Sequence, residues 1–218
     1  ASIGMLLTVI HAVLFCAVGV IVTKPFLSMF TENEKILQWG CEYSYIVLCL
    51  AFGCLLQISM EKIFQAVGDM VTTMALLASG CIINIILDPI MIFGLLGFPA
   101  LGVKGAAIAT VIGQICAFLL YVLVYSKKDI GIKISLRYVS FDKRIIKQIY
   151  AVGIPSTIMM ALPSLLVSIL NGILSKFSDL HVAVLGIYFK LQTFIYMPAN
   201  GVVQGMRPII GFNYGAGE

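Results

Sequence analysis

The chain has 218 residues, of which 61% are hydrophobic and 11% are charged, and its formal net charge is +4. A soluble domain usually carries about 25% charged residues, so this composition excludes an ordinary soluble domain with a single core. The apolar excess indicates an integral membrane protein. The small net charge gives no indication of a nucleic-acid partner.

Six apolar segments follow one another along the chain, although polar residues interrupt the second, fifth and sixth. A membrane-spanning helix needs about 20 residues, and all six segments are long enough. The period-two alternation of a membrane barrel is absent. The first segment is not expected to be a signal peptide, because it has no basic start and further spans follow it. We therefore predict an all-α, polytopic membrane bundle with transmembrane helices near 4–23, 43–66, 72–97, 105–126, 150–175 and 182–206.

The connection between the fourth and fifth segments is strongly basic, with only Asp129 and Asp142 opposing its cations. Basic loops stay on the cytoplasmic side of a membrane. This orientation predicts a multi-pass protein of the cell inner (cytoplasmic) membrane with both ends of the chain cytoplasmic. Residues 140–150 are amphipathic and are expected to form an interfacial helix that leads into the fifth segment, the alternative being a role in regulation or partner binding. The basic residues are Lys127, Lys128, Lys133, Arg137, Lys143, Arg144 and Lys147.

An ionisable side chain, Asp88, stands well inside the third apolar segment, directly before Pro89. A charge at mid-membrane costs about 2.5–3.5 kcal/mol, so such residues tend to face a cavity or a partner. Asn84 lies one turn earlier on the same helix face, and Pro89 leaves the Ile85 carbonyl without its usual donor. This set could hold a proton or a sodium ion. Alternatively, Asp88 lies near the outer interface and only packs against a kink.

The second segment carries a stripe of residues on one helix face that becomes polar at Gln57, Glu61 and Gln65. A polar helix face inside a bilayer should border water or protein. We therefore expect Gln57 and Glu61 to line a cavity, together with Gln114 of the fourth segment. The alternative is that Glu61 and Lys62 lie at the inner mouth and reach the headgroups.

Small residues and prolines indicate how the helices pack and bend. Residues 105–113 of the fourth segment are rich in glycine and alanine, and residues 201–205 form a GxxxG motif. Such stretches let membrane helices approach closely, and Thr110 could add a hydrogen bond to a shared cavity. Pro155 and Pro163 predict a bend or a break in the fifth segment.

No motif in the sequence indicates catalysis or a bound cofactor. The six cysteines contain no CxxC pair, the two histidines are isolated, and no phosphate loop or nucleophile motif appears. Cysteines inside apolar segments are typical small packing residues. We therefore expect no enzyme activity, no cofactor, no dedicated metal site and no nucleic-acid partner.

Five motifs occur in order along nearly the whole chain: "FQAVGDMVTTM", "NIILDPIMIFG", "GVKGAAIATVIGQ", "VGIPS" and "YFKLQTFIYMPANGVVQGMRPIIGFNYGAGE". Together they resemble the multidrug and toxic compound extrusion (MATE) transporters, in a form common in Gram-positive bacteria. Members of that family have twelve helices in two lobes of six. The resemblance implies that this chain is the central part, helices three to eight.

The same resemblance implies three regions. Residues 1–126 would be the remainder of the N-lobe, with four transmembrane helices. Residues 127–149 would be the basic cytoplasmic loop between the lobes, and residues 150–218 would begin the C-lobe with two helices.

Site residues also follow from the resemblance. Members with an N-lobe cation site carry an asparagine and an aspartate four apart on helix five, and Asn84 and Asp88 match that spacing. Tyr43 and Thr110 align with a tyrosine and a threonine of the same site. In some relatives a helix-seven glutamate stands where this chain has Pro163, so the N-lobe site is expected to couple transport.

The function implied is secondary active multidrug efflux, a form of xenobiotic transport. An antiporter would export cationic or amphipathic drugs in exchange for protons or sodium by alternating access. It would be surrounded by membrane lipids, and any sodium ion would be held at Asp88. One alternative is a lipid-linked oligosaccharide flippase of the same superfamily, which should carry several cations inside its spans, where this chain has Lys190. Another is a non-transporting channel or scaffold, which predicts no counter-ion dependence.

Overall fold

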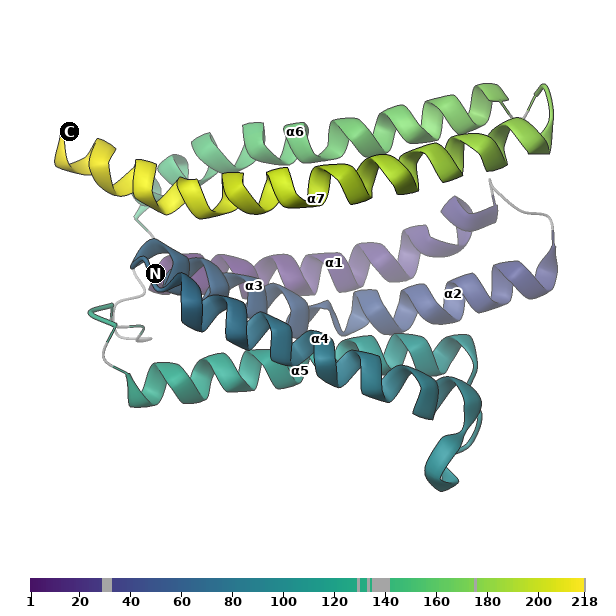
Figure 1. The fold of residues 1–218 in the computed structure, drawn as a ribbon, viewed down its shortest axis with the longest axis horizontal. Helices are drawn as coiled ribbons and strands as arrows, with labels where there is room; N and C mark the ends of the chain where they lie inside the picture. Colours follow the sequence, from purple (N-terminus) through teal and green to yellow (C-terminus); the bar gives the residue numbers. More distant parts are fainter. Residues whose placement is uncertain (29–32, 129, 133, 135–141, 175, 218) are drawn as a thin grey trace. The chain divides into compact units, whose positions relative to one another are not determined.

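A computed structural model describes residues 1–28, 33–128, 130–132, 134, 142–174 and 176–217. The described residues form seven α-helices and one short 3-10 helix, with no strand among them (Figure 1). The prediction of an all-α fold is therefore confirmed. The chain divides into two compact units, residues 1–139 and residues 140–218, and each is described by itself.

The first unit contains five helices that pack against one another, with α4 and α5 the most extensively paired (Figure 1). Two of its helices begin at side-chain caps. Asn33 accepts hydrogen bonds at the start of α2, and Asp69 accepts one from the backbone N–H of Thr72 at the start of α4. The elements are α1 (Ser2–Ser28), α2 (Glu34–Cys49), α3 (Ala51–Ala66), α4 (Met70–Phe93), the 3-10 helix η1 (Leu95–Gly97) and α5 (Val103–Lys127).

The second predicted segment differs most from the structure. The sequence predicts one helix at 43–66, whereas the structure has α2 and α3 with a break at Leu50 and a bend of 47°. Leu50 leaves the helical conformation at φ −101° and ψ 14°. The residue at the break is a leucine and not a helix-breaking proline or glycine, so the sequence pattern at this position does not predict the break.

The helices are not broken at their prolines, and the bends predicted at Pro89, Pro155 and Pro163 stay predictions. Helix α4 continues through Pro89, and α6 (Lys143–Leu174) continues through both Pro155 and Pro163. Because α6 begins at Lys143, its first turns lie inside the predicted loop 127–149, and that part of the loop is helical. Positions 129, 133 and 135–141 of that loop, which include Lys133 and Arg137, lie outside the described residues.

The best-packed part of the first unit lies where α3, α4 and α5 meet. Met60, Phe64, Leu76 and Tyr121 form a buried cluster, and the rings of Phe64 and Tyr121 are 5.5 Å apart between centroids. The Tyr121 hydroxyl donates a hydrogen bond to the Thr73 carbonyl at 3.1 Å. A buried phenol normally needs such a partner, so this bond fixes α5 against α4.

The second unit consists of α6 and α7 (Asp179–Ala216). Its described side chains contribute no buried residue, and Met160 and Phe212 are about four-fifths exposed. A Cβ at Gly201 or Gly205 would meet nothing within 4 Å, so the GxxxG motif makes no close helix contact in the described structure. Exposed apolar surface of this kind is typical of helices that face lipid or other membrane helices.

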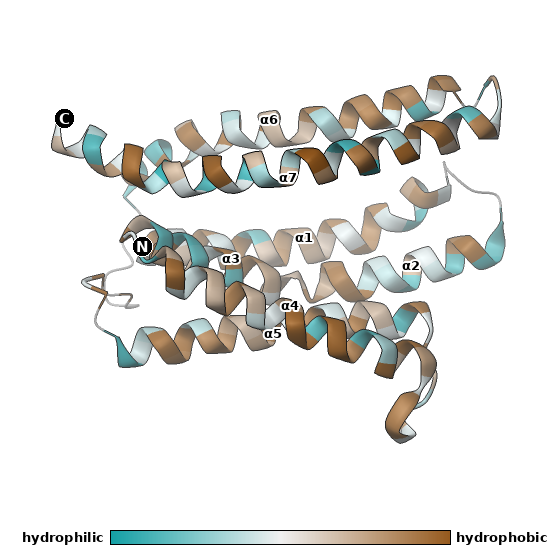
Figure 2. Ribbon diagram, viewed as in Figure 1, coloured by the Kyte–Doolittle hydropathy of each residue, from teal (hydrophilic) through white to brown (hydrophobic). Residues whose placement is uncertain are grey.

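Within the described part of the chain, four helices, α1, α4, α5 and α6, are long and apolar enough to cross a membrane. The bent pair α2–α3 adds a fifth candidate span. Helix α7 has 38 residues and covers the sixth predicted segment, with hydrophilic positions interspersed among its apolar ones (Figure 2).

Candidate functional site

Glycines on α4 and α5 create the close helix contact on which the site is built. A Cβ placed on Gly113 would lie 2.9 Å from the Gly80 carbonyl oxygen and 3.1 Å from the Asn84 Cβ. A Cβ placed on Gly105 would overlap the Met91 carbonyl oxygen. Both positions therefore need glycine, and the resulting approach brings α5 directly onto the face of α4 that carries Asn84.

Asn84 links the two helices through its side-chain amide. Its Nδ2 donates to Asp88 Oδ1 at 3.3 Å and to Thr110 Oγ1 at 3.5 Å, while the Thr110 hydroxyl donates to the Ala106 carbonyl at 2.9 Å. The two amide bonds are longer than the usual 2.7–3.2 Å range for an N–H donor. A carboxylate has about four lone-pair sites, so Asp88 keeps acceptor capacity for a proton or cation.

A polar pocket of about 280 Å³ lies between α3, α4 and α5 beside this link. The predicted cavity residues Gln57, Glu61 and Gln114 all line it, whereas Asp88 itself does not. Drug-sized pockets usually measure about 300–1,000 Å³, so this one suits small ions and water better than a drug. Its lining is Cys54, Gln57, Ile58, Glu61, Leu77, Gly80, Cys81, Asn84, Thr110, Gly113 and Gln114.

The Glu61 carboxylate, which lines this pocket, is hydrogen-bonded to two neighbouring side chains on α3. Its Oε1 accepts hydrogen bonds from Lys62 Nζ at 3.2 Å and from Gln65 Nε2 at 2.8 Å. Lys62 also donates to Gln65 Oε1 at 2.9 Å. The carboxylate is 13% exposed and the lysine 51% exposed, so the ion pair runs from the pocket to the surface.

Tyr43 is the predicted site residue that the structure does not join to the others. It lies on α2 with 37% of its surface exposed. Among the described residues, no hydrogen bond connects it with Asn84, Asp88 or Thr110. Pro89 is exposed next to Asp88, and Pro163 borders a groove within the second unit.

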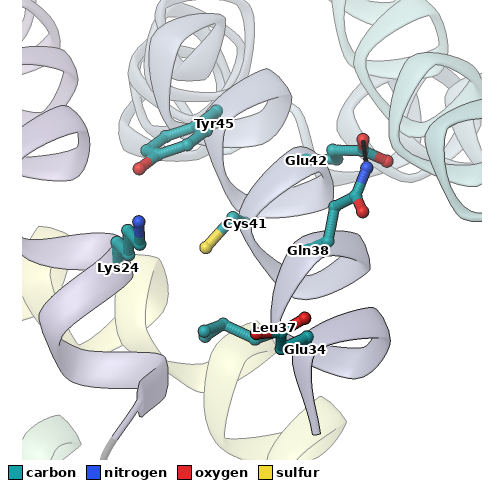
Figure 3. A pocket seen from close by; sticks show the side chains of 7 residues that line it. All are labelled: Lys24, Glu34, Leu37, Gln38, Cys41, Glu42 and Tyr45. Atoms are coloured by element: carbon teal, nitrogen blue, oxygen red, sulfur yellow. Dashed lines mark hydrogen bonds between the residues drawn. The ribbon is translucent and has the colours of Figure 1, made fainter.

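A second pocket, of about 550 Å³, lies between α1 and α2, and no pattern in the sequence indicates it (Figure 3). Glu42 in this pocket accepts from Gln38 Nε2 at 3.0 Å and pairs with Lys104 Nζ at 3.1 Å. Figure 3 shows Lys24 on α1 across the pocket from Cys41. Because nearby lysines offset its carboxylates, this pocket has little net charge and is not a candidate cation site.

The opposite end of the first unit is held by an ion pair between Asp69 and Lys128. Lys128, and secondly Thr72, hold the pKa of the Asp69 carboxyl below its usual range. The Tyr125 hydroxyl donates to the Ile132 carbonyl at 3.0 Å and accepts from the Ile134 N–H at 2.7 Å. These bonds attach the described start of the basic loop to the helical bundle.

Comparison with known proteins matches the chain to the MatE family model over residues 1–90 and 155–218. It is 28% identical over 198 residues to a protein named multidrug export protein MepA from Staphylococcus haemolyticus (strain JCSC1435). That alignment covers 89% of this chain but 43% of the relative, so the chain spans less than half of the relative's length.

Solved structures agree with this family match. A transporter of the MOP superfamily from Pyrococcus furiosus Vc1 (DSM3638) shares the fold with a TM-score of 0.89 at 24% identity, over 98% of this chain and 48% of that one. A structure described as the MATE multidrug transporter DinF-BH in complex with a dye gives a TM-score of 0.84 at 26% identity. It covers 97% of this chain and 47% of that transporter.

Proposed function

Because the chain belongs to the MatE family, we propose that it forms the central part of a multidrug efflux antiporter. The complete transporter would export cationic or amphipathic drugs in exchange for protons or sodium ions. The name of the staphylococcal relative and the dye complex of the structural neighbour support drug export as the activity. In this proposal residues 1–126 complete the N-lobe, 127–149 connect the lobes at the cytoplasmic side, and 150–218 begin the C-lobe.

The observation that carries ion coupling is the Asp88–Asn84–Thr110 link between α4 and α5. When Asp88 is ionised, it accepts from the Asn84 amide nitrogen. A protonated Asp88 gains an O–H donor that needs an acceptor of its own, while its other oxygen can still accept from the Asn84 amide nitrogen. Protonation or sodium binding neutralises the carboxylate and so weakens its hydrogen bond from the Asn84 amide. Since the same amide nitrogen bonds Thr110, a change at Asp88 can alter how α4 is held to α5.

Such a link can drive alternating access. A ligand shifts a conformational equilibrium only by the difference between its affinities for the two states. A carboxylate that is solvated in the outward-open state and buried in the inward-open state provides that difference, because burial disfavours the charged form. The coupling ion would bind on the outer side and leave toward the cytoplasm, while the drug moves outward.

The experiment is Asp88→Asn in the full-length transporter, reconstituted into vesicles with an imposed proton or sodium gradient. The variant keeps the size and hydrogen-bonding capacity of the side chain but removes its titrating charge. We expect gradient-driven drug efflux to fall strongly while drug binding persists. Asp142→Asn is the matched control, because the Asp142 carboxylate accepts from the Arg144 N–H before α6, and asparagine accepts there equally well. Efflux by Asp88→Asn at the wild-type rate would show that Asp88 does not couple transport.

A further inference from the structure

One end of the polar pocket contains a buried amide that has no side-chain hydrogen bond among the described residues. Gln57 is 8% exposed and lines the pocket. No fully buried side-chain N or O atom lacks a partner among the described residues, so the Gln57 amide atoms keep some exposure beside the pocket that the side chain lines. Buried polar side chains are normally hydrogen-bonded, so this amide points to a ligand or water inside the pocket.

Glu61 lies one turn after Gln57 on α3 and lines the same pocket. Among the described residues, the hydrogen bonds that its carboxylate accepts come from Lys62 and Gln65, and both fall on Oε1. Its Oε2 therefore keeps its lone pairs for another partner. A carboxylate oxygen and an amide oxygen one helical turn apart are the hard oxygen ligands that small cations prefer.

Lys62 is the positively charged partner of Glu61, and the other titratable side chains near it are a phenol, thiols and an imidazole. On α5 the Tyr121 phenol lies close enough to interact electrostatically with Glu61. The thiols of Cys54 and Cys81 line the pocket from α3 and α4. Helix α1, which also packs on α3, carries His11, whose Nδ1 lies 2.7 Å from the Leu7 carbonyl oxygen.

We propose that Gln57 and Glu61 form a second cation station on the cytoplasmic side of Asp88, and that Lys62 displaces the ion from it. This inference rests on the proposed antiport function. The coupling cation, released from the Asp88 region, passes through the pocket and binds between the Gln57 and Glu61 oxygens. The station is distinct from the Asp88–Asn84–Thr110 link, which borders the other end of the same pocket.

Lys62 makes release favourable because it offers Glu61 a replacement partner. A carboxylate left without a partner in a partly buried site is costly, because its charge has lost part of its water. While the cation occupies the station, the exposed Lys62 ammonium can turn to water. When the cation leaves, the ammonium restores the pair at 3.2 Å, so the station empties without leaving an isolated charge.

The position of Glu61 agrees with an exit toward the cytoplasm. Helix α3 ends at Ala66, just after Glu61, and the following turn carries Asp69. Asp69 pairs with Lys128 at the start of the basic loop, which is the cytoplasmic side in the proposed topology.

The test uses the full-length transporter in vesicles, with Glu61→Gln, Lys62→Gln and the control Glu42→Gln. Glu42 matches Glu61 because it also pairs with a lysine, at 3.1 Å, but it lies outside this pocket. Drug binding and thermal unfolding are measured for each variant, and efflux is measured with sodium or protons varied on the cytoplasmic side.

We expect Glu61→Gln to slow gradient-driven efflux by about fivefold or more, the size of a typical coupling between sites, without changing the drug Kd. Lys62→Gln should make cytoplasmic cation inhibit efflux at about fivefold lower concentration, because the ion is no longer displaced. Lys62 is exposed, so its variant remains informative if Glu61→Gln folds poorly.

Wild-type efflux and wild-type cation inhibition in both variants would overturn the second station. If Asp88→Asn still abolishes coupling in that case, the antiport proposal stands. If the wild-type transporter shows no counter-ion dependence at all, the antiport proposal fails and the second station fails with it.

Discussion

The contact between α4 and α5 can be tested by adding one methyl group at Gly113. A Cβ at this position would lie 2.9 Å from the Gly80 carbonyl oxygen and 3.1 Å from the Asn84 Cβ. Real carbon atoms do not approach a backbone oxygen so closely, so Gly113→Ala must push the helices apart. Overpacking of this kind costs about 1–3 kcal/mol. The Asn84–Thr110 bond, already 3.5 Å long, would be lost at a slightly larger separation.

The assay is thermal unfolding in detergent together with gradient-driven efflux by the full-length transporter. We expect Gly113→Ala to lower both the unfolding temperature and the efflux rate. Gly4→Ala is the matched control, because a Cβ there meets nothing within 4 Å and alanine favours the helix by up to about 1 kcal/mol. Wild-type stability and wild-type efflux in Gly113→Ala would refute the close contact between α4 and α5.

Two further predictions concern the end of the first unit near the basic loop. Lys128 lowers the pKa of Asp69 in the folded protein. The ion pair therefore contributes its full stability to the fold above the unfolded pKa of about 3.9, and this contribution is lost as the pH falls from there through the lower folded pKa. Asp69→Asn keeps the helix cap and should flatten acid unfolding below about pH 4, as followed by circular dichroism; an unchanged profile would contradict this. Tyr121→Phe removes the bond to Thr73 and should cost about 1 kcal/mol in unfolding free energy. Tyr188→Phe, at a side chain that is 56% exposed, should lower the unfolding free energy far less. Equal losses in the two variants would contradict a stabilising hydrogen bond from Tyr121 to Thr73.

Hydropathy alone predicts the helical class and most helix positions, because lipid as solvent demands long apolar runs with internally satisfied backbones. It does not predict the break at Leu50, where no proline or glycine stands. It also places the start of α6 too late, because the polar turns from Lys143 onward are helical but not apolar. Pro155 and Pro163 lie inside a helix that continues through them.

For the candidate site, helical spacing predicts the neighbours on one helix but not the pairing between helices. Asn84 and Asp88 are four residues apart, so their bond follows from helix geometry. The bond from Asn84 to Thr110 depends on how closely α4 and α5 pack, which the structure supplies. The placement of the Gln57 amide and the Lys62 partner of Glu61 depend on side-chain positions that periodicity does not determine.

The most direct test of antiport is to measure ion movement while a drug gradient is imposed on vesicles that contain the full-length transporter. With no ion gradient at the start, drug leaving through the transporter should drive protons or sodium in the opposite direction. Asp88→Asn should abolish that ion movement. We expect opposite, coupled fluxes of drug and ion in the wild type and not in Asp88→Asn. Drug flux through the wild type without any counter-flux of protons or sodium would contradict the antiport mechanism.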